Sequence, residues 1–235
     1  MNDRVNLANL LSVTVDEIQQ SWHVILIYSG LIVVLSSGLF GLIGATDYGF
    51  LGSDVWAGAG SPSTTGSTVI LGVLAALGFQ ILTSFYLLAG MFHRTTSPSF
   101  DALLPFIGIT ILYWIAIGIG FVLLIIPGII FTVRFVPLLP IVLSQKGPAL
   151  DAFGKSFDMT DGRGWSIFGA YVIFYIALMV VSGIMTGFSA LLGPWGIVLA
   201  EAFQTLLSTI IFTALSVGAY RLMIDDTQGL SQIFE

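Results

Sequence analysis

The sequence contains few charged residues and no cysteine. Only 9% of its 235 residues are charged, compared with about 25% in an average soluble domain. So few charges cannot cover a globule in water, and this excludes both a soluble enzyme and a disordered tail. A mean hydropathy of +1.00 indicates the same. The absence of cysteine excludes a disulfide framework and a cysteine-ligated metal.

Residues and motifs that carry catalytic chemistry are also scarce. The two histidines, His23 and His93, lack the spacing of a metal-binding helix, and we expect them to be interface residues. Neither a Gly-x-Ser-x-Gly nucleophile motif nor a glycine-rich nucleotide loop occurs. The net charge of −6 argues against a nucleic-acid partner. The composition therefore predicts an integral membrane protein that is not an enzyme and binds no cofactor.

Long apolar runs, by contrast, are abundant. A helix that crosses the hydrocarbon core needs about 20 mainly apolar residues. The runs predict six spans, at 24–44, 69–92, 104–126, 129–144, 165–188 and 196–219. The fourth is short and contains Arg134, Pro137 and Pro140, but membrane helices tolerate proline. We therefore predict an all-α, six-helix transmembrane bundle in a single domain, residues 1–235.

The basic residues are distributed asymmetrically around these spans. Apart from Arg134, all of them fall on one side, at Arg4, Arg94, Lys146, Lys155, Arg163 and Arg221. The long loop on the other side, Ala45–Ser67, contains Asp47 and Asp54 but no basic residue. The positive-inside rule therefore predicts that both termini are cytoplasmic. We expect a multi-pass protein of the inner (plasma) membrane of a bacterium or archaeon.

Three of the predicted cytoplasmic segments share a short pattern, in which a small residue lies four positions before an aspartate. The aspartates are Asp16, Asp101 and Asp151. Pro98 and Pro148 occupy the position of a first helical residue, and negative charge is favoured in a first turn. The pattern predicts interfacial helices over 12–22, 97–104 and 148–160, each followed by a transmembrane hairpin. Chance recurrence of helix-start residues is the alternative to this three-fold repeat.

Two opposite charges, Arg134 and Glu201, fall inside predicted spans. Each lies seven residues after a turn proline, Pro127 or Pro194, so both are expected roughly 10 Å from the outer end at about 1.5 Å per residue. Because a charge within the bilayer needs a partner, we predict a buried Arg134–Glu201 ion pair. We favour a structural clamp between helices. A polar site for an ion, a proton or a lipid headgroup, and snorkelling toward water, are the alternatives.

The segment from Gly147 to Gly164 combines charged and aromatic residues in the manner of an amphipathic helix on the cytoplasmic leaflet. Within and after it, Lys155, Arg163 and Trp165 are candidates for contact with lipid headgroups or with a partner protein. Farther along, Gly183–Gly187 matches the small-xxx-small helix-contact motif. We expect it to pack within the chain rather than to join two subunits.

One set of residues carries a family resemblance. It comprises Ile126-Pro127-Gly128-Ile129-Ile130, Val133-Arg134, Pro140, Ala152-Phe153-Gly154-Lys155-Ser156-Phe157, Thr160 and Gly162-Arg163-Gly164-Trp165. In these residues the chain resembles the YciC-like membrane proteins and the membrane domain attached to some bacterial glycerophosphodiester phosphodiesterases, best over 120–170. The resemblance implies a six-span bundle. The metal ligands of the fused phosphodiesterase correspond to no position here.

The leading hypothesis is a non-enzymatic accessory or scaffold subunit within the bilayer, in envelope or lipid homeostasis. Its expected partners are membrane lipids and either a larger membrane complex or a second copy of the chain. The alternative is a small transporter or channel with Arg134 and Glu201 along a polar path. An intramembrane hydrolase would need a nucleophile–base pair or a metal cluster, and the sequence provides neither.

Overall fold

The computed structural model describes residues 5–43, 66–95, 101–123, 125–144, 148–189 and 194–231, and all regular structure in them is α-helical. The helices are α1 (Leu7–Gln20), α2 (Trp22–Ile43), α4 (Gly66–His93), α5 (Leu103–Leu123), α6 (Ile125–Arg134), α7 (Leu138–Ser144), α8 (Asp151–Met159), α9 (Gly164–Ser189) and α10 (Pro194–Ser231). The predicted all-α class is confirmed.

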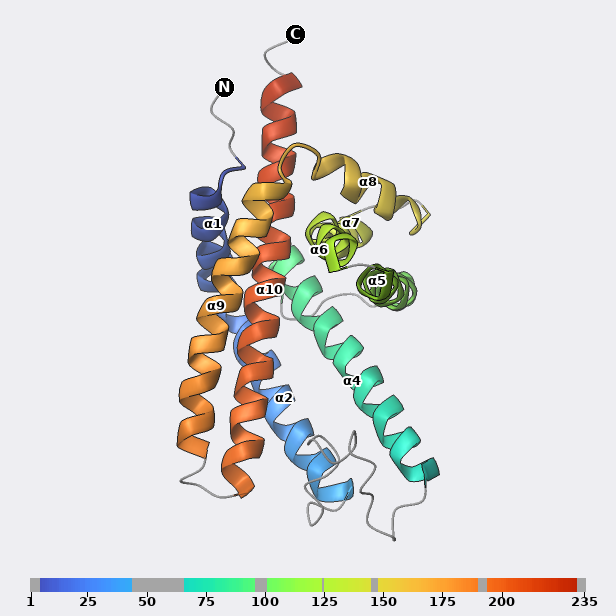
Figure 1. Cartoon of the computed structure of the whole chain (residues 1–235), viewed down its shortest axis with the longest axis vertical. Coiled ribbons are helices and arrows are strands. Elements are labelled where there is room, and N and C mark those ends of the chain that lie inside the picture. The colour runs from blue at the N-terminus through green and yellow to red at the C-terminus, as the bar shows by residue number, and fades with distance from the viewer. Residues whose placement is uncertain are drawn as a thin grey trace.

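Helix α10, the longest of the described helices, lies at the centre of the helix packing (Figure 1). It packs against α1, α2, α4, α7 and α9. Helix α9 runs antiparallel beside it, and α2 and α4 diverge from it on the other side. The start of α1, the end of α10 and helix α8 lie at the same end of the molecule, which we call the α8 end.

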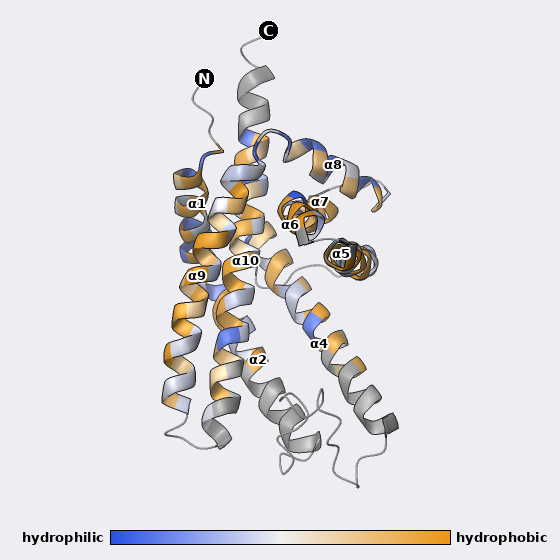
Figure 2. Ribbon diagram, in the orientation of Figure 1, coloured by the Kyte–Doolittle hydropathy of each residue, from blue (hydrophilic) through white to orange (hydrophobic). Residues whose placement is uncertain are grey.

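Among the described residues, four apolar stretches are long enough to cross a membrane: Leu103–Val122, Ile126–Ser144, Gly164–Ser189 and Ala202–Asp225. Figure 2 shows the apolar character of α9 and α5 over most of their length. These helices indicate a membrane protein. In α2 and α4 the described side chains cover only part of each helix, and the apolar stretches within that part are Trp22–Ile32 and Leu77–His93. The six-span count therefore stays a prediction.

Helices α5 and α6 form a close hairpin that runs across the direction of α9 and α10, since both are seen end-on in Figure 1. Glycines allow the two helices to approach. A Cβ on Gly128 would lie 2.6 Å from the Phe121 ring, and one on Gly120 would lie 3.0 Å from the Gly128 Cα. Any larger residue would separate the helices.

The predicted fourth span is broken, because α6 ends at Arg134 and α7 begins at Leu138. Pro140 has no N–H to donate to the carbonyl four residues earlier, which is that of Val136. The Ser216 hydroxyl of α10 donates to the Val136 carbonyl instead. A neighbouring helix thus satisfies the backbone group that the proline leaves without a partner, as membrane helices require.

Two of the three predicted interfacial segments form short helices, α1 and α8. Helix α1 runs alongside α9 and α10 and buries Leu10, Thr14 and Glu17 against them. The third segment, 97–104, lies partly outside the described residues, and α5 begins within it at Leu103. Asp101 and Ala102 lie in a turn. The described part of this segment therefore contains no separate helix before α5. The three-fold repeat stays a prediction.

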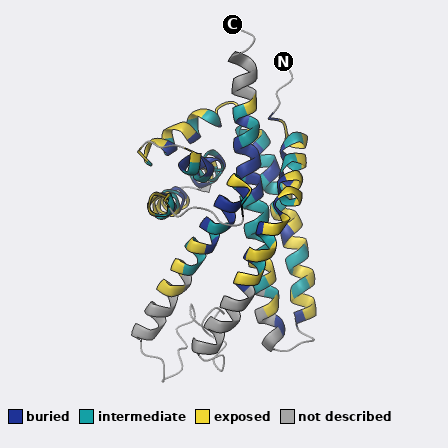
Figure 3. Ribbon diagram, turned by 180° about the vertical axis from the view of Figure 1, so that it is seen from behind, coloured by how far each residue is buried: buried dark blue, intermediate teal, exposed yellow. Residues whose placement is uncertain are grey.

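Burial is uneven along the molecule (Figure 3). Buried positions concentrate in the half nearer the α8 end, and exposed positions dominate the other half of α9. That half presents large apolar side chains, such as Met179, Ile184 and Phe188, each more than half exposed. Such a surface suits contact with lipid rather than water.

Candidate functional site

Arg134, the last residue of α6, reaches from the hairpin to α8. Its Nη1 donates to the Phe157 carbonyl at 3.0 Å and lies 3.5 Å from Thr160 Oγ1. Its Nη2 forms an ion pair with Asp161 Oδ1 at 3.1 Å. The guanidinium carbon also lies 5.7 Å from the centroid of the Phe157 ring. Arg134 therefore binds the C-terminal end of α8, where carbonyls without a helical partner favour a cation.

The contact between α6 and α8 is reciprocal. Because Leu138 N donates to Phe135 O, the break after α6 leaves the Arg134 carbonyl without its usual amide donor. The buried Ser156 hydroxyl donates to that carbonyl at 2.6 Å. The Thr160 hydroxyl in turn donates to the Ser156 carbonyl at 2.8 Å. Ser156 and Thr160, two of the residues that carry the resemblance, thus link α8 to the break after α6.

The predicted Arg134–Glu201 pair is not tested by the described residues, but the surroundings of Arg134 bear on its premise of equal depth. Val136, two residues after Arg134, contacts Ser216, which lies 15 residues beyond Glu201 in the continuous helix α10, or about 22 Å along its axis. This separation does not favour the equal depth assumed for the pair, which stays a prediction. The charged partner of Arg134 in the described residues is Asp161. The side chain of Glu201 lies outside them, so its own partner stays untested.

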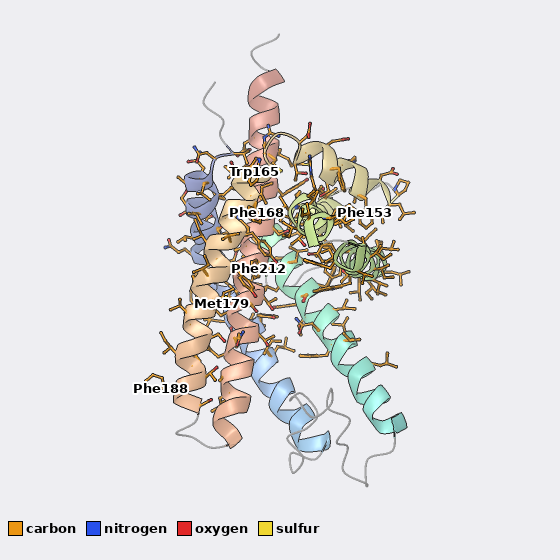
Figure 4. All side chains as sticks on the ribbon, in the orientation of Figure 1. Phe153, Trp165, Phe168, Met179, Phe188 and Phe212 are labelled. Carbon is orange, nitrogen blue, oxygen red and sulfur yellow. The ribbon has the colours of Figure 1, made fainter. Side chains whose placement is uncertain are left out.

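Aromatic rings fill the space between α8 and the hairpin. Phe135 is buried, and its ring centroid lies 5.1 Å from that of Phe153 and 5.3 Å from that of Phe157. Phe131 stacks on Phe135 at 5.7 Å. Figure 4 labels Phe153 on the side of α8 that faces the hairpin. The predicted amphipathic helix is therefore present, with its apolar face covered by the chain itself.

The three candidate contact residues near α8 differ in their surroundings. Lys155 is exposed on α8, and Arg163 is half-buried with its Nη1 donating to the Met159 carbonyl at 3.1 Å. Trp165 at the start of α9 is 86% exposed and is labelled near the α8 end in Figure 4. Lys155 and Trp165 therefore remain candidates for a lipid or partner contact, whereas Arg163 helps to close the turn between α8 and α9.

A second charged cluster, which the sequence analysis missed, joins α1, α4 and α10. Glu17 of α1 is buried and accepts a hydrogen bond from Arg221 Nη1 of α10. Arg94, just after α4, lies 3.7 Å from the same Glu17 oxygen. The second oxygen, Glu17 Oε2, and the Ser21 hydroxyl one turn away are buried without a hydrogen-bond partner among the described residues. We call these residues the Glu17 cluster.

Arg221 also binds the end of α4. Its Nη2 donates to the carbonyls of Met91 and Phe92, at 3.3 and 3.1 Å. There Arg94 adopts a left-handed conformation with φ of 50°, while Thr95 N donates to Gly90 O at 3.0 Å. This is a helix-ending motif in which glycine usually occupies the left-handed position. Arginine at that position places a second cation near Glu17.

The sequence contained a weak signal for this cluster. Leu10, Thr14 and Glu17 are spaced as one face of a helix, and all three are buried. A glutamate on the apolar face of an amphipathic helix requires a partner. The identity of that partner depends on tertiary packing, because Arg221 lies 204 residues away.

The other sequence motifs have simpler environments. The His23 ring lies 3.5 Å from that of Trp22, and the His93 ring lies 5.0 Å from that of Phe92. No group of three or more His, Asp or Glu in the described part of the chain is placed to hold a metal. Nothing described lies within 4 Å of a Cβ built on Gly183 or Gly187, so the expected packing of this motif within the chain finds no support there.

Comparison with known proteins adds no identification. No protein-family model, curated protein or solved structure matches the chain. The resemblance to the YciC-like proteins therefore stays a prediction, and the function must be argued from the two charged clusters and the exposed residues around α8.

Proposed function

We propose that this protein is a non-enzymatic accessory subunit of a membrane assembly and that the region around α8 is its docking surface. The proposal places it in the inner membrane with both termini and the α8 end in the cytoplasm. Arg94, Lys155, Arg163 and Arg221 all belong to segments at or near the α8 end, which supports this orientation.

The observation that carries the proposal is the use of Arg134 within its own chain. Its guanidinium is occupied by Phe157, Thr160 and Asp161, and its carbonyl is occupied by Ser156. An arginine that binds a transported ion or substrate needs N–H donors that can exchange partners. Here the donors of Arg134 hold α8 on the hairpin. This supports a structural clamp, and it favours a scaffold protein over a transporter with a polar path.

The clamp presents the outer face of α8 in a fixed position. Lys155, Asp158 and Asp161 are exposed on or next to it, and Leu150 and Trp165 flank it with 65% and 86% of their surface exposed. A large aromatic and an aliphatic side chain beside charged residues are typical of a protein interface or of a headgroup contact. The expected partners are a cytoplasmic part of a larger membrane complex and the lipids around it.

Membership of the YciC-like family is part of this proposal. Its support is physical: the residues that carry the resemblance, from Val133-Arg134 through Ser156-Phe157 to Thr160, form one contact unit. A role in envelope or lipid homeostasis would follow from that membership.

Purification from native membranes into nanodiscs tests the proposed function. We expect the full chain to migrate as part of an assembly larger than itself. The Trp165→Ala and Lys155→Glu changes together should release it, while Ile176→Ala, at an exposed apolar position of α9, serves as the control and should not. Two results together would instead support the transporter: the chain migrates unassembled, and in liposomes it conducts an ion or solute flux. Arg134→Met should then abolish that flux.

A further inference from the structure

The α5–α6 hairpin has an unusually apolar tip. No charged residue occurs between Asp101 and Arg134, and residues 115–131 consist only of Ile, Ala, Gly, Phe, Val, Leu and Pro. The turn is included in that run, because α5 ends at Leu123 and α6 begins at Ile125. A hairpin that crosses a bilayer exposes its turn to water on the far side. This turn offers water no polar side chain.

The hairpin is also exposed along much of its length. Val122 and Ile126 at the tip are 87% and 70% exposed, and Trp114 and Ile119 on α5 are 65% and 53% exposed. Side chains radiate around α5 in Figure 4. A helix lying half in water would present a polar face, and α5 has none. A helix that is apolar all round requires an apolar environment on every exposed side.

The position of the hairpin differs from that of the long helices. It lies across α9 and α10 in the half of the molecule nearer the α8 end, far from the end of α9 and the start of α10 (Figure 1). Its open end is anchored there by Arg134 on α8. On α5, buried Phe106 meets Phe85 of α4 with ring centroids 5.2 Å apart. In this arrangement the tip of the hairpin does not reach the end of the molecule opposite α8.

We propose that α5 and α6 form an intramembrane hairpin, which enters the bilayer from the α8 side and returns to it, with Val122 and Ile126 in contact with acyl chains. Helices α2, α4, α9 and α10 are then the four that cross. The number of crossings stays even, so both termini remain on one side, and every basic residue keeps the side assigned by the positive-inside rule.

The described ends of the two helices are compatible with a hydrocarbon environment. Irregular backbone exposed to lipid is not tolerated, and helical backbone is described up to Leu123 and again from Ile125. Pro127 is the third residue of α6, where an N–H would have no partner within the helix. The close contact of Gly120 with Gly128 keeps the two helices together immediately behind the tip.

The absence of native cysteine allows a direct test. Val122→Cys and Ile126→Cys are made separately in the full chain and reconstituted into sealed vesicles of both orientations. Asp158→Cys on α8 reports the α8 side, and Ser61→Cys, in the loop predicted on the other side, reports that side. Each variant is exposed to a membrane-impermeant maleimide. We expect each control to react from its own side and neither tip cysteine to react from either side.

A second measurement distinguishes lipid from protein around the tip. A nitroxide is attached to each tip cysteine in detergent before reconstitution, and its collision rates with oxygen and with a water-soluble nickel complex are compared. We expect frequent collisions with oxygen and few with nickel. Maleimide labelling from the Ser61 side would show that the hairpin crosses, and labelling from the α8 side would place the tip in water. A nitroxide shielded from both collision partners would indicate a second copy of the chain. Each of these three results overturns the proposal.

Discussion

The two charged clusters use the same chemistry in different environments. In each, an arginine binds one carboxylate and the C-terminal end of a helix. Arg221 binds Glu17 of α1 and two carbonyls at the end of α4, and Arg134 binds Asp161 and one carbonyl at the end of α8. They differ in exposure, since the Glu17 side chain is 4% exposed and the Asp161 side chain is 78% exposed.

Exposure decides which contact in each cluster matters for stability. Removing one partner of a buried ion pair leaves an uncompensated charge, which is strongly destabilising. An exposed ion pair is screened by water and salt and contributes little. We therefore expect the carboxylate to dominate the Glu17 cluster. In the Arg134 cluster the hydrogen bonds to the Phe157 and Arg134 carbonyls should dominate.

The largest expected effect comes from breaking the Glu17 pair. Arg221→Met should lower the free energy of unfolding by about 3 kcal/mol, the lower end of the usual range for breaking a buried pair, because the buried Glu17 then keeps the longer, 3.7 Å contact with Arg94. Adding Glu17→Gln should recover part of the loss. Unfolding by denaturant in a mild detergent measures both. Asp16→Asn, at the exposed neighbouring position, is the control and should change little. Equal stability of Arg221→Met and the parent would contradict the assignment.

The all-helical class and most helix positions could be predicted from sequence, because long apolar runs and turn residues are local signals. The predicted fifth span, 165–188, lies within α9 (Gly164–Ser189), and the amphipathic segment after Gly147 forms α8. The break after Arg134 was less predictable. Pro137 and Pro140 indicate a distortion, but whether a neighbouring helix can satisfy the freed carbonyl depends on Ser216, 80 residues away from Val136.

The partners of the charged residues could not be predicted for the same reason. The Arg134–Glu201 pairing assumed that all spans run parallel, so that equal offsets from a turn mean equal depth. The hairpin runs across the long helices instead, and offsets in α6 and α10 are not comparable. Charge pairs depend on the relative orientation of helices, which apolar periodicity does not encode.

The second prediction concerns the close approach of α2 to the end of α4. A Cβ on Gly90 would lie 2.5 Å from Val24 Cγ1 and 3.1 Å from the Thr95 carbonyl. Gly90→Ala should therefore destabilise by about 1–3 kcal/mol through overpacking and displace the carbonyls that Arg221 binds. Gly78→Ala on the same helix is the control, since nothing lies within 4 Å of its Cβ. The comparison is made by thermal unfolding, and two variants of equal stability would argue against this packing.

A smaller effect is expected in the Arg134 cluster from Ser156→Ala. The change leaves the Arg134 carbonyl without its hydroxyl donor. The free energy of unfolding should fall by about 1–2 kcal/mol, a value between the net contribution of one hydrogen bond and the penalty for an unpaired buried carbonyl. Loosening of α8 should also speed proteolysis after Lys155, measured by limited digestion. Ser144→Ala is the matched control, because that exposed hydroxyl donates to the Ile141 carbonyl of its own helix. Identical digestion rates for both variants would mean that Ser156 does not hold α8.

The smallest effect is expected from Asp161→Asn, although it removes the only formal charge that faces Arg134 in the described residues. With 78% of the Asp161 side chain exposed, the loss should stay below about 1 kcal/mol, because Arg134 keeps its hydrogen bond to the Phe157 carbonyl. Raising the salt concentration should remove even this difference, since salt screens exposed charges far more than buried ones. The penalty of Arg221→Met should persist in the same salt series. Unfolding free energies measured at low and high salt for both variants and the parent provide the check. If Asp161→Asn lowered the free energy of unfolding as much as Arg221→Met, and equally at low and high salt, burial would not explain the different stability contributions of the two carboxylates.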